Sequence, residues 1–321
     1  MTVNEKALES FRSYADPRRG IVERFLTPQI GGKQTVGVLS GPTGDRRDAG
    51  WVICHSFGME QVFLQPVEVA VARQLAASGF SSLRFHSQGY GDSEGSTDDV
   101  RLESHVRDAL DAMRVLVAET GVSKVGFLGG RFGGTVAALA ACRSDAKALM
   151  LWEPISDGRR YMRELLRIAA MTEVATAARF KSSTQDAAKI FAETGIIDVQ
   201  GYPLGRAVFE EVSAFDLLSA VVGFKGESVV VQISPSSKPR PELERLVARL
   251  DQMGGRTSLE ILVDPEARRF GFQRYYATPD GQRKDDKQEA MSEKLVSLTV
   301  TWCMGWDAGG SVSSQEAADD E

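Results

Sequence analysis

The chain has 321 residues, a formal net charge of −6 at pH 7 and a hydrophobic content of 42%. This composition supports a large folded core and excludes a disordered chain. The acidic balance argues against a nucleic-acid-binding surface, and the sequence has no run of about 18 apolar residues that would cross a membrane.

Residues 1–20 carry acidic side chains and lack an apolar core, so we predict a polar N-terminal arm rather than a signal peptide. The three cysteines, Cys54, Cys142 and Cys303, are odd in number and unpatterned, which indicates reduced thiols in a cytoplasmic protein. The three histidines show no ligand spacing, so neither a metal site nor a cofactor is expected.

Apolar segments alternate with turn residues along the first half of the chain. Two of them surround Gly31 and Gly32 and predict an opening β-hairpin. In chain order, the pattern then predicts a strand at 51–54, a helix at 64–79, a strand from 81, a helix at 99–121, a strand at 124–130, a helix at 132–142 and a strand at 147–154. Strands that alternate with helices indicate a mostly parallel sheet with helices on both faces.

This alternation breaks between about 155 and 220, where the sequence is mostly helical and predicts no strand. The alternation returns afterwards with a strand at 227–234, a helix at 240–254, a strand at 257–264 and a helix at 284–304. Residues 305–321 are rich in glycine, serine and acids, so we predict a disordered acidic tail. The sequence therefore predicts one α/β domain over 21–304 that contains a helical insertion.

The segment KVGFLGGRFGGTVAALAA, residues 124–141, carries the most specific local signal. A buried strand, a sharp turn flanked by glycines and an alanine-rich helix have the layout of a nucleophile elbow, G-x-S-x-G. Arg131 stands at the serine position. An arginine cannot attack a carbonyl as serine does, because its guanidinium stays protonated.

Longer segments extend this similarity. Residues 55–99, HSFGMEQVFLQPVEVAVARQLAASGFSSLRFHSQGYGDSEGSTDD, resemble the segment of serine-aminopeptidase-like α/β hydrolases that begins at the oxyanion loop. Residues 151–167, LWEPISDGRRYMRELLR, and residues 198–218, DVQGYPLGRAVFEEVSAFDLL, are similar to bacterial α/β hydrolases associated with exosortase gene clusters. The resemblance implies an α/β-hydrolase fold over 21–304, with the insertion at 155–220 as a helical lid.

The resemblance also defines where a Ser-His-Asp triad belongs. The loop after strand 227–234 offers no carboxylate before Glu242, although some relatives place the acid after the preceding strand, where Glu153 stands. The histidine belongs after strand 257–264, but the sequence has no histidine after His105. Loss of even one triad member lowers the rate by several orders of magnitude, so we do not expect ordinary serine hydrolysis.

An anion-binding pocket is compatible with the residues that remain at the turn. The backbone N–H of Phe132 and that of Phe57 or Gly58 correspond to an oxyanion hole in working relatives. Arg131 adds a positive charge there, and two interpretations stay open. Either Arg131 clamps a carboxylate, phosphate or acyl oxygen of a ligand, or it folds back onto Glu153 or Glu60 and fills the pocket.

The histidines and aromatic residues supply further candidates. We predict that His55 shapes the oxyanion loop, with a role as general acid/base as the alternative. His86 is predicted to organise its loop, with catalysis as the alternative, and His105 is predicted to lie at the surface. The aromatic residues expected to line a ligand pocket, or to fill it, are Phe57, Phe132, Trp152, Phe270 and Phe272.

These residues favour an atypical α/β-hydrolase-fold protein without a triad, which binds an acyl, carboxylate or peptide ligand under its lid. The alternative is a non-hydrolytic enzyme, such as an epimerase, a lyase or another tailoring enzyme, that uses the oxyanion hole and Arg131. A weak esterase or peptidase is the third hypothesis. A homodimer or a protein partner stays open.

Overall fold

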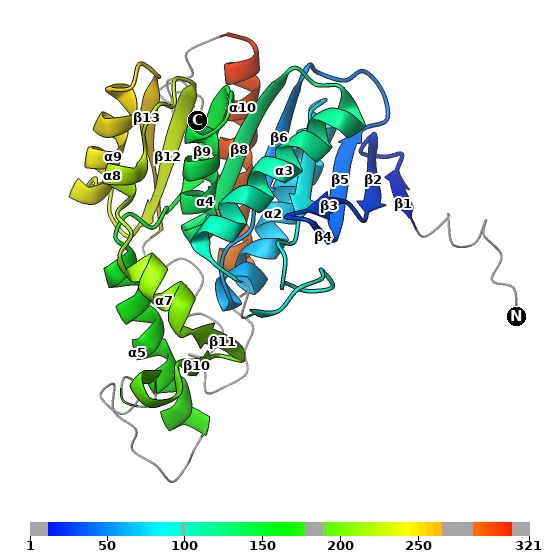
Figure 1. Cartoon of the computed structure of the whole chain (residues 1–321). Helices are drawn as coiled ribbons and strands as arrows, with labels where there is room; N and C mark the ends of the chain where they lie inside the picture. Colours follow the sequence, from blue (N-terminus) through cyan, green and yellow to red (C-terminus); the bar gives the residue numbers. More distant parts are fainter. Residues whose placement is uncertain (1–11, 98–99, 177–188, 190, 265–284, 310–321) are drawn as a thin grey trace, which may run out of the picture.

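The computed structural model describes residues 12–97, 100–176, 189, 191–264 and 285–309 (Figure 1). Its largest sheet has nine strands. Across the sheet the strands are β1 (Ser13–Asp16), β2 (Ile21–Leu26), β5 (Gly37–Pro42), β7 (Ser81–Phe85), β6 (Ala49–Cys54), β8 (Lys124–Gly130), β9 (Ala148–Trp152), β12 (Glu227–Ser234) and β13 (Thr257–Val263). The neighbours from β7 to β13 pair in parallel, and the pairs from β1 to β7 are antiparallel.

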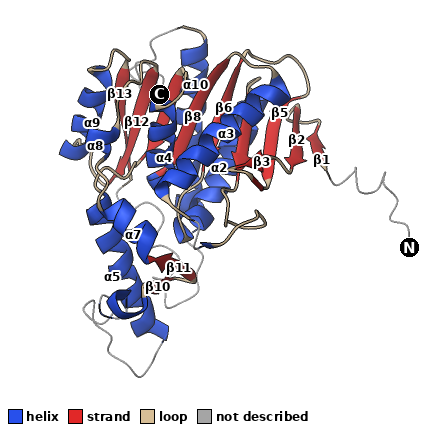
Figure 2. Ribbon diagram, in the orientation of Figure 1, coloured by secondary structure: helices blue, strands red, loops and turns tan. Residues whose placement is uncertain are grey.

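Helices cover both faces of this sheet, as Figure 2 shows. They are α2 (Met59–Ala77), α3 (Leu102–Thr120), α4 (Arg131–Cys142), α9 (Pro241–Asp251) and α10 (Asp285–Asp307). Side chains of α3, α4 and α9 share one buried cluster, and side chains of α2 and α10 share another. The expected mostly parallel sheet between two helical layers is therefore present.

Strand β9 shows why the sheet has two cores. Successive side chains of a strand point to opposite faces. Leu149 and Leu151 accordingly pack with α3 and α4, whereas Met150 and Trp152 pack on the α10 side. The Trp152 indole nitrogen donates to Thr299 Oγ1 of α10 at 3.1 Å. The prediction that Trp152 lines a ligand pocket is wrong, because the strand period directs it into the opposite core.

The insertion lies at the carboxyl end of the parallel strands, below the sheet in Figure 1. It contains α5 (Gly158–Thr176), β10 (Ile196–Val199), β11 (Tyr202–Gly205), α7 (Arg206–Ser213) and α8 (Leu217–Ala220). The expectation that it has no strand is wrong. β10 and β11 form an antiparallel hairpin whose turn residues, Gln200 and Gly201, both have positive φ, as a tight two-residue hairpin turn requires.

The ends of the chain differ in part from the prediction. β2 and β5 pair antiparallel, as the opening hairpin requires, and a second small hairpin, β3 (Gln29–Ile30) with β4 (Lys33–Gln34), lies between them. Ser13–Asp16 is a strand within the expected polar arm, and α10 continues past 304 to Asp307. Residues 1–11 and 310–321 lie outside the described residues. Within the described ranges, no helix is long and apolar enough to cross a membrane.

Helix α2 buries a carboxylic acid that has no ion-pair partner within 4 Å in the described chain. Glu68 is 4% exposed, and its Oε1 has no hydrogen-bond partner there. Burial raises the pKa of Glu68 to about 8, although the positive charge of Arg84 opposes this effect. The folded protein therefore holds this proton over a pH range in which the unfolded chain releases it.

Replacement of Glu68 by glutamine is therefore expected to stabilise the protein at neutral pH. The pKa of Glu68 is higher in the folded state, so its contribution to stability falls as the pH rises from 4.5 to about 8. We expect Glu68→Gln to exceed the wild type by ~3 kcal/mol near pH 7 and by little near pH 4. Urea unfolding at several pH values measures this, with the exposed Glu244→Gln as control. A constant difference across this range contradicts the prediction.

Candidate functional site

The sharp turn predicted around Arg131 is present. β8 ends at Gly130, Arg131 has a φ of 51°, and α4 begins at once. A non-glycine residue at positive φ is uncommon and persists where its surroundings hold it. A Cβ on Gly133 would overlap the carbonyl oxygen of Cys54, and a Cβ on Gly129 would overlap the carbonyl of Gly133. The glycines therefore let the turn lie directly against β6.

The Arg131 side chain forms an ion pair inside the protein. Its Nε donates to Glu60 Oε1 at 3.0 Å, and its Nη2 lies 3.9 Å from Glu164 Oε2. The guanidinium carbon lies 5.8 Å from the centre of the Tyr161 ring, within cation–π range. Burial alone lowers the pKa of Arg131, but the charges of Glu60, Tyr161 and Glu164 and the hydrogen bond to Glu60 together raise this pKa above its ordinary value. The arginine therefore stays charged.

Glu60 is the centre of this polar network and is 1% exposed. Its Oε2 accepts hydrogen bonds from Ser56 Oγ at 2.7 Å and from the Tyr161 hydroxyl at 2.9 Å. A buried ion pair is tolerated when further hydrogen bonds satisfy its remaining polar atoms, and here Ser56 and Tyr161 supply them to Glu60. Of the two glutamates that the sequence offered as partners of Arg131, the structure selects Glu60. The charge of Arg131 is thus neutralised within the protein.

Glu153 connects other elements. It has a φ of 48° directly after β9, and its Oε1 accepts hydrogen bonds from the backbone N–H of Ile233 at 2.6 Å and from Arg240 Nη2. This carboxylate therefore ties β9 to β12 and to the start of α9. The prediction that Glu153 could pair with Arg131 is wrong, because its carboxylate faces Arg240.

The ring of His55 is fully hydrogen-bonded. Its Nε2 accepts from the backbone N–H of Ser87 at 3.0 Å, so its Nδ1 carries the proton and donates to the carbonyl of Ser56 at 2.8 Å. Burial, followed by the nearby His105 and His86, holds the pKa of His55 well below its usual range. This geometry favours the structural role predicted for His55 over proton transfer.

His105 is buried, and the prediction of a surface position is wrong. It is 1% exposed, and its ring lies 5.3 Å from those of His55 and Tyr90 and 5.4 Å from that of Phe132. Its Nδ1 donates to the carbonyl of Arg101 at 2.8 Å. Burial lowers the pKa of His105 to about 4, so the ring is neutral. All three histidines of the chain lie together, since the rings of His86 and His105 are 6.0 and 5.3 Å from that of His55.

Two tyrosines contact the loop that was predicted to supply part of the oxyanion hole. The backbone N–H of Gly58 donates to the Tyr90 hydroxyl at 3.3 Å. Tyr202 of β11 packs over the same glycine, since a Cβ on Gly58 would lie 3.7 Å from Tyr202 Cβ. The Gly58 N–H predicted to contact a ligand is thus engaged within the protein. Phe132 is buried between the rings of Phe57 and Tyr161.

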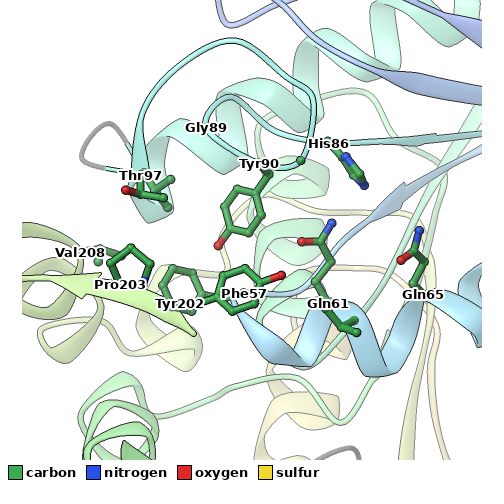
Figure 3. A pocket seen from close by; sticks show the side chains of 13 residues that line it. Phe57, Gln61, Gln65, His86, Gly89, Tyr90, Thr97, Tyr202, Pro203 and Val208 are labelled. Carbon is green, nitrogen blue, oxygen red and sulfur yellow. The ribbon is translucent and has the colours of Figure 1, made fainter. Parts of the chain in front are cut away.

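A cavity of about 180 Å³ lies beside this loop. Figure 3 shows aromatic side chains, including Tyr90 and Tyr202, toward the β10–β11 hairpin, and Gln61, Gln65 and His86 toward α2 and the end of β7. Its described lining residues are Phe57, Gln61, Val62, Gln65, His86, Gly89, Tyr90, Gly91, Thr97, Val100, Tyr202, Pro203 and Val208. Arg131 is not among these lining residues, so the cavity is displaced from the turn.

The predicted site residues therefore separate into groups. Phe57 and His86 line the cavity, whereas Gly58 and Phe132 lie behind it. Phe270 and Phe272 lie outside the described residues. Sequence reasoning missed Gln61 and Tyr202. Gln61 could have been found, because it lies three positions after Gly58 at the start of a helix. Tyr202 could not, because it belongs to a hairpin in a segment that was predicted to be mostly helical. In the described chain, no cluster of potential metal ligands is found.

Neither a protein-family model nor a curated protein sequence matches the chain. Solved structures do match it. An esterase from Pyrococcus furiosus is 12% identical over 91% of this chain and 94% of its own, with a TM-score of 0.58. The α/β hydrolase GrgF from Penicillium sp. sh18 is 16% identical over 90% of this chain and 99% of its own, with a TM-score of 0.56.

Est1E from Butyrivibrio proteoclasticus, solved with ferulic acid bound, is also similar. It is 17% identical over 86% of this chain and 97% of its own, with a TM-score of 0.55. With the nine-stranded, mostly parallel sheet and the strand–turn–helix at Arg131, these likenesses define the fold. The chain has the α/β-hydrolase fold.

Proposed function

We propose that this chain is an α/β-hydrolase-fold protein without a working triad, which binds a small ligand in its cavity and does not hydrolyse it. The observation that carries the proposal is Arg131 at the nucleophile position, with its guanidinium paired to the buried Glu60. A charged guanidinium cannot act as a nucleophile, and the ion pair leaves it directed into the protein.

The surrounding groups support the same proposal. A serine hydrolase needs an imidazole that takes the proton of its nucleophile. Both ring nitrogens of His55 have partners, and no histidine follows His105 in the sequence. The Gly58 N–H is also engaged by Tyr90. Neither the His55 ring nor the Gly58 N–H is thus free to act in hydrolysis.

The ligand site that we propose is the cavity of about 180 Å³ beneath the β10–β11 hairpin. A single buried water needs roughly 10–15 Å³ of such space, so the cavity has room for a small molecule or a side chain. The insertion acts here as a lid, because Tyr202, Pro203 and Val208 form one wall. Ligand sites in open α/β sheets lie at this carboxyl end of the strands.

We expect no hydrolytic activity from the purified protein. A fluorophosphonate probe, which labels activated serines, should give no adduct, and p-nitrophenyl butyrate should show only its background rate. Arg131→Ser should also remain inactive, because the new hydroxyl would have no imidazole to take its proton. Intact-mass spectrometry and absorbance measure these outcomes. Labelling or turnover by the wild-type protein contradicts the proposal.

A non-hydrolytic enzyme is the second candidate, and His86 favours it. This residue lines the cavity, and its Nδ1 is buried without a hydrogen-bond partner in the described chain. Burial lowers the pKa of His86, although the negative charge of Asp92 opposes this, so the ring is a neutral proton acceptor. In an epimerisation, His86 would take a proton from a carbon beside a carbonyl, water would return a proton to the other face of the carbanion, and the imidazolium would release its proton to the hydroxide left behind.

This second candidate has its own test. An N-acylated amino-acid amide incubated with the protein in D2O would gain deuterium at its α-carbon, as NMR can follow. His86→Gln would stop this exchange if His86 moves the proton. A protein that only binds its ligand would produce no deuterium uptake above that of the free compound.

A further inference from the structure

The cavity is uncharged, which separates it from the anion site expected at the turn. No described lining residue is an aspartate, glutamate, lysine or arginine. The single titratable imidazole, that of His86, is neutral because burial lowers its pKa. The acidic side chains of Asp92 and Glu60 adjoin the lining residues Gly91 and Gln61 in the sequence. An anion in this cavity would find no cation to pair with.

The cavity nevertheless offers hydrogen bonds that the protein leaves unused. Gln61 is 7% exposed and lines the cavity, and its amide forms no hydrogen bond within the described chain. The side-chain carboxamide of Gln61 is therefore available to donate to and accept from a ligand in the cavity. His86 also lines the cavity, and its Nδ1 has no hydrogen-bond partner in the described chain. The Tyr90 hydroxyl accepts from Gly58, which leaves its own hydrogen to donate.

The opposite part of the cavity is aromatic and apolar. The rings of Phe57, Tyr90 and Tyr202 lie there with Pro203 and Val208 (Figure 3). Such surfaces stabilise planar or aromatic groups through burial and ring contacts. A ligand that fits both parts carries an aromatic or planar group beside neutral donors and acceptors.

We propose that the cavity binds an uncharged, peptide-like ligand, in which an aromatic side chain enters between the tyrosines and an amide bonds to Gln61 and His86. This inference rests on the ligand site of the proposed function and adds its chemical class. The carboxamide of Gln61 pairs with a ligand amide through one donor and one acceptor. A sugar presents hydroxyl groups on every edge, and the apolar wall around Val208 offers them no partner.

A matched pair of compounds tests the ligand class. N-acetyl-L-tyrosinamide and N-acetyl-L-tyrosine differ only in a carboxamide against a carboxylate. Titration of the full-length protein, followed by calorimetry or NMR, should show that the amide binds at least about tenfold more tightly. The same tyrosine within a blocked tripeptide distinguishes the source, because tighter binding of the tripeptide indicates a peptide segment and weaker binding indicates a small amide.

Variants locate the binding. Gln61→Leu and Tyr202→Ala should each weaken binding of the amide at least about tenfold. Gln74→Leu, at an exposed position of the same helix, and Tyr14→Ala, on the exposed edge strand β1, should leave it unchanged. Equal or tighter binding of the carboxylate, no saturable binding of the amide, or equal effects of the controls overturns the inference. Hydrolysis of the amide would instead contradict the proposed function, so the two failures are distinguishable.

Discussion

Replacing Glu60 by alanine is expected to lower the free energy of unfolding by about 3–5 kcal/mol. The change removes the partner of Arg131 and leaves a buried guanidinium, only 16% exposed, without its closest carboxylate. It also removes the acceptor of Ser56 Oγ and of the Tyr161 hydroxyl. Chemical unfolding monitored by circular dichroism measures the loss.

Two controls separate the charge effect from the loss of packing. The double variant Glu60→Leu with Arg131→Met removes both charges and should regain most of the stability, because apolar residues of similar size often replace a buried pair at little cost. The exposed pair of Arg24 and Glu119 has a closer contact of 2.7 Å, with side chains that are 45% and 37% exposed. Glu119→Ala should therefore cost less than ~1 kcal/mol. Equal losses at Glu60 and Glu119 would contradict the argument.

The Glu60 network also joins the insertion to the sheet, since Tyr161 belongs to α5 and Arg131 to the turn after β8. Loss of Glu60 should consequently raise hydrogen exchange in α5 more than in α9, whose described residues do not contact this network. A uniform increase over both helices would indicate a general loss of stability instead. The ion pair of Arg131 with Glu60, together with the Tyr161 hydroxyl, thus connects the insertion to the sheet.

The sequence was sufficient for the sheet because its signals are local. Strand β9 is a short, continuous apolar run, ALMLW, that ends just before Pro154, and such a run is typical of a strand buried on both faces. Helical spacing could likewise have placed His105 correctly. Leu102, His105, Val106 and Ala109 follow the spacing of one helical face, and all four are buried. A polar residue on that face belongs to the core when its hydrogen bond is satisfied.

The site is built from contacts between segments that are far apart in the sequence. The sequence alone did not show which of the possible contacts form. Glu60 and Glu153 were both acceptable partners for Arg131, and only the directions of α2 and β9 decide between them. Tyr202 reaches Gly58 from an insertion that has no continuous periodic signal. The sequence led us to expect an anion site at Arg131, whereas the structure has an internal ion pair there and a separate cavity without charged lining residues.

Replacing Gly133 by alanine is expected to lower the free energy of unfolding by at least about 3 kcal/mol, although helix propensity alone predicts the opposite sign. Gly133 lies within α4, where alanine is favoured over glycine by about 1 kcal/mol. The new Cβ, however, would overlap the backbone carbonyl of Cys54 and lie 2.8 Å from the His55 carbonyl carbon. Backbone atoms of a central strand cannot move aside as a flexible side chain can.

Whether Gly133→Ala lowers or raises the stability distinguishes steric overlap with β6 from helix propensity. Gly205→Ala is the matched control, because a Cβ there meets no atom within 4 Å and the residue has a negative φ of −81°. It should change stability by no more than about 0.5 kcal/mol. If Gly133→Ala does not fold, Gly133→Ser should not fold either, because serine adds a Cβ at the same place. A stabilised Gly133→Ala would show that the turn and β6 are farther apart, and the close approach of Arg131 to Glu60 would then need another explanation.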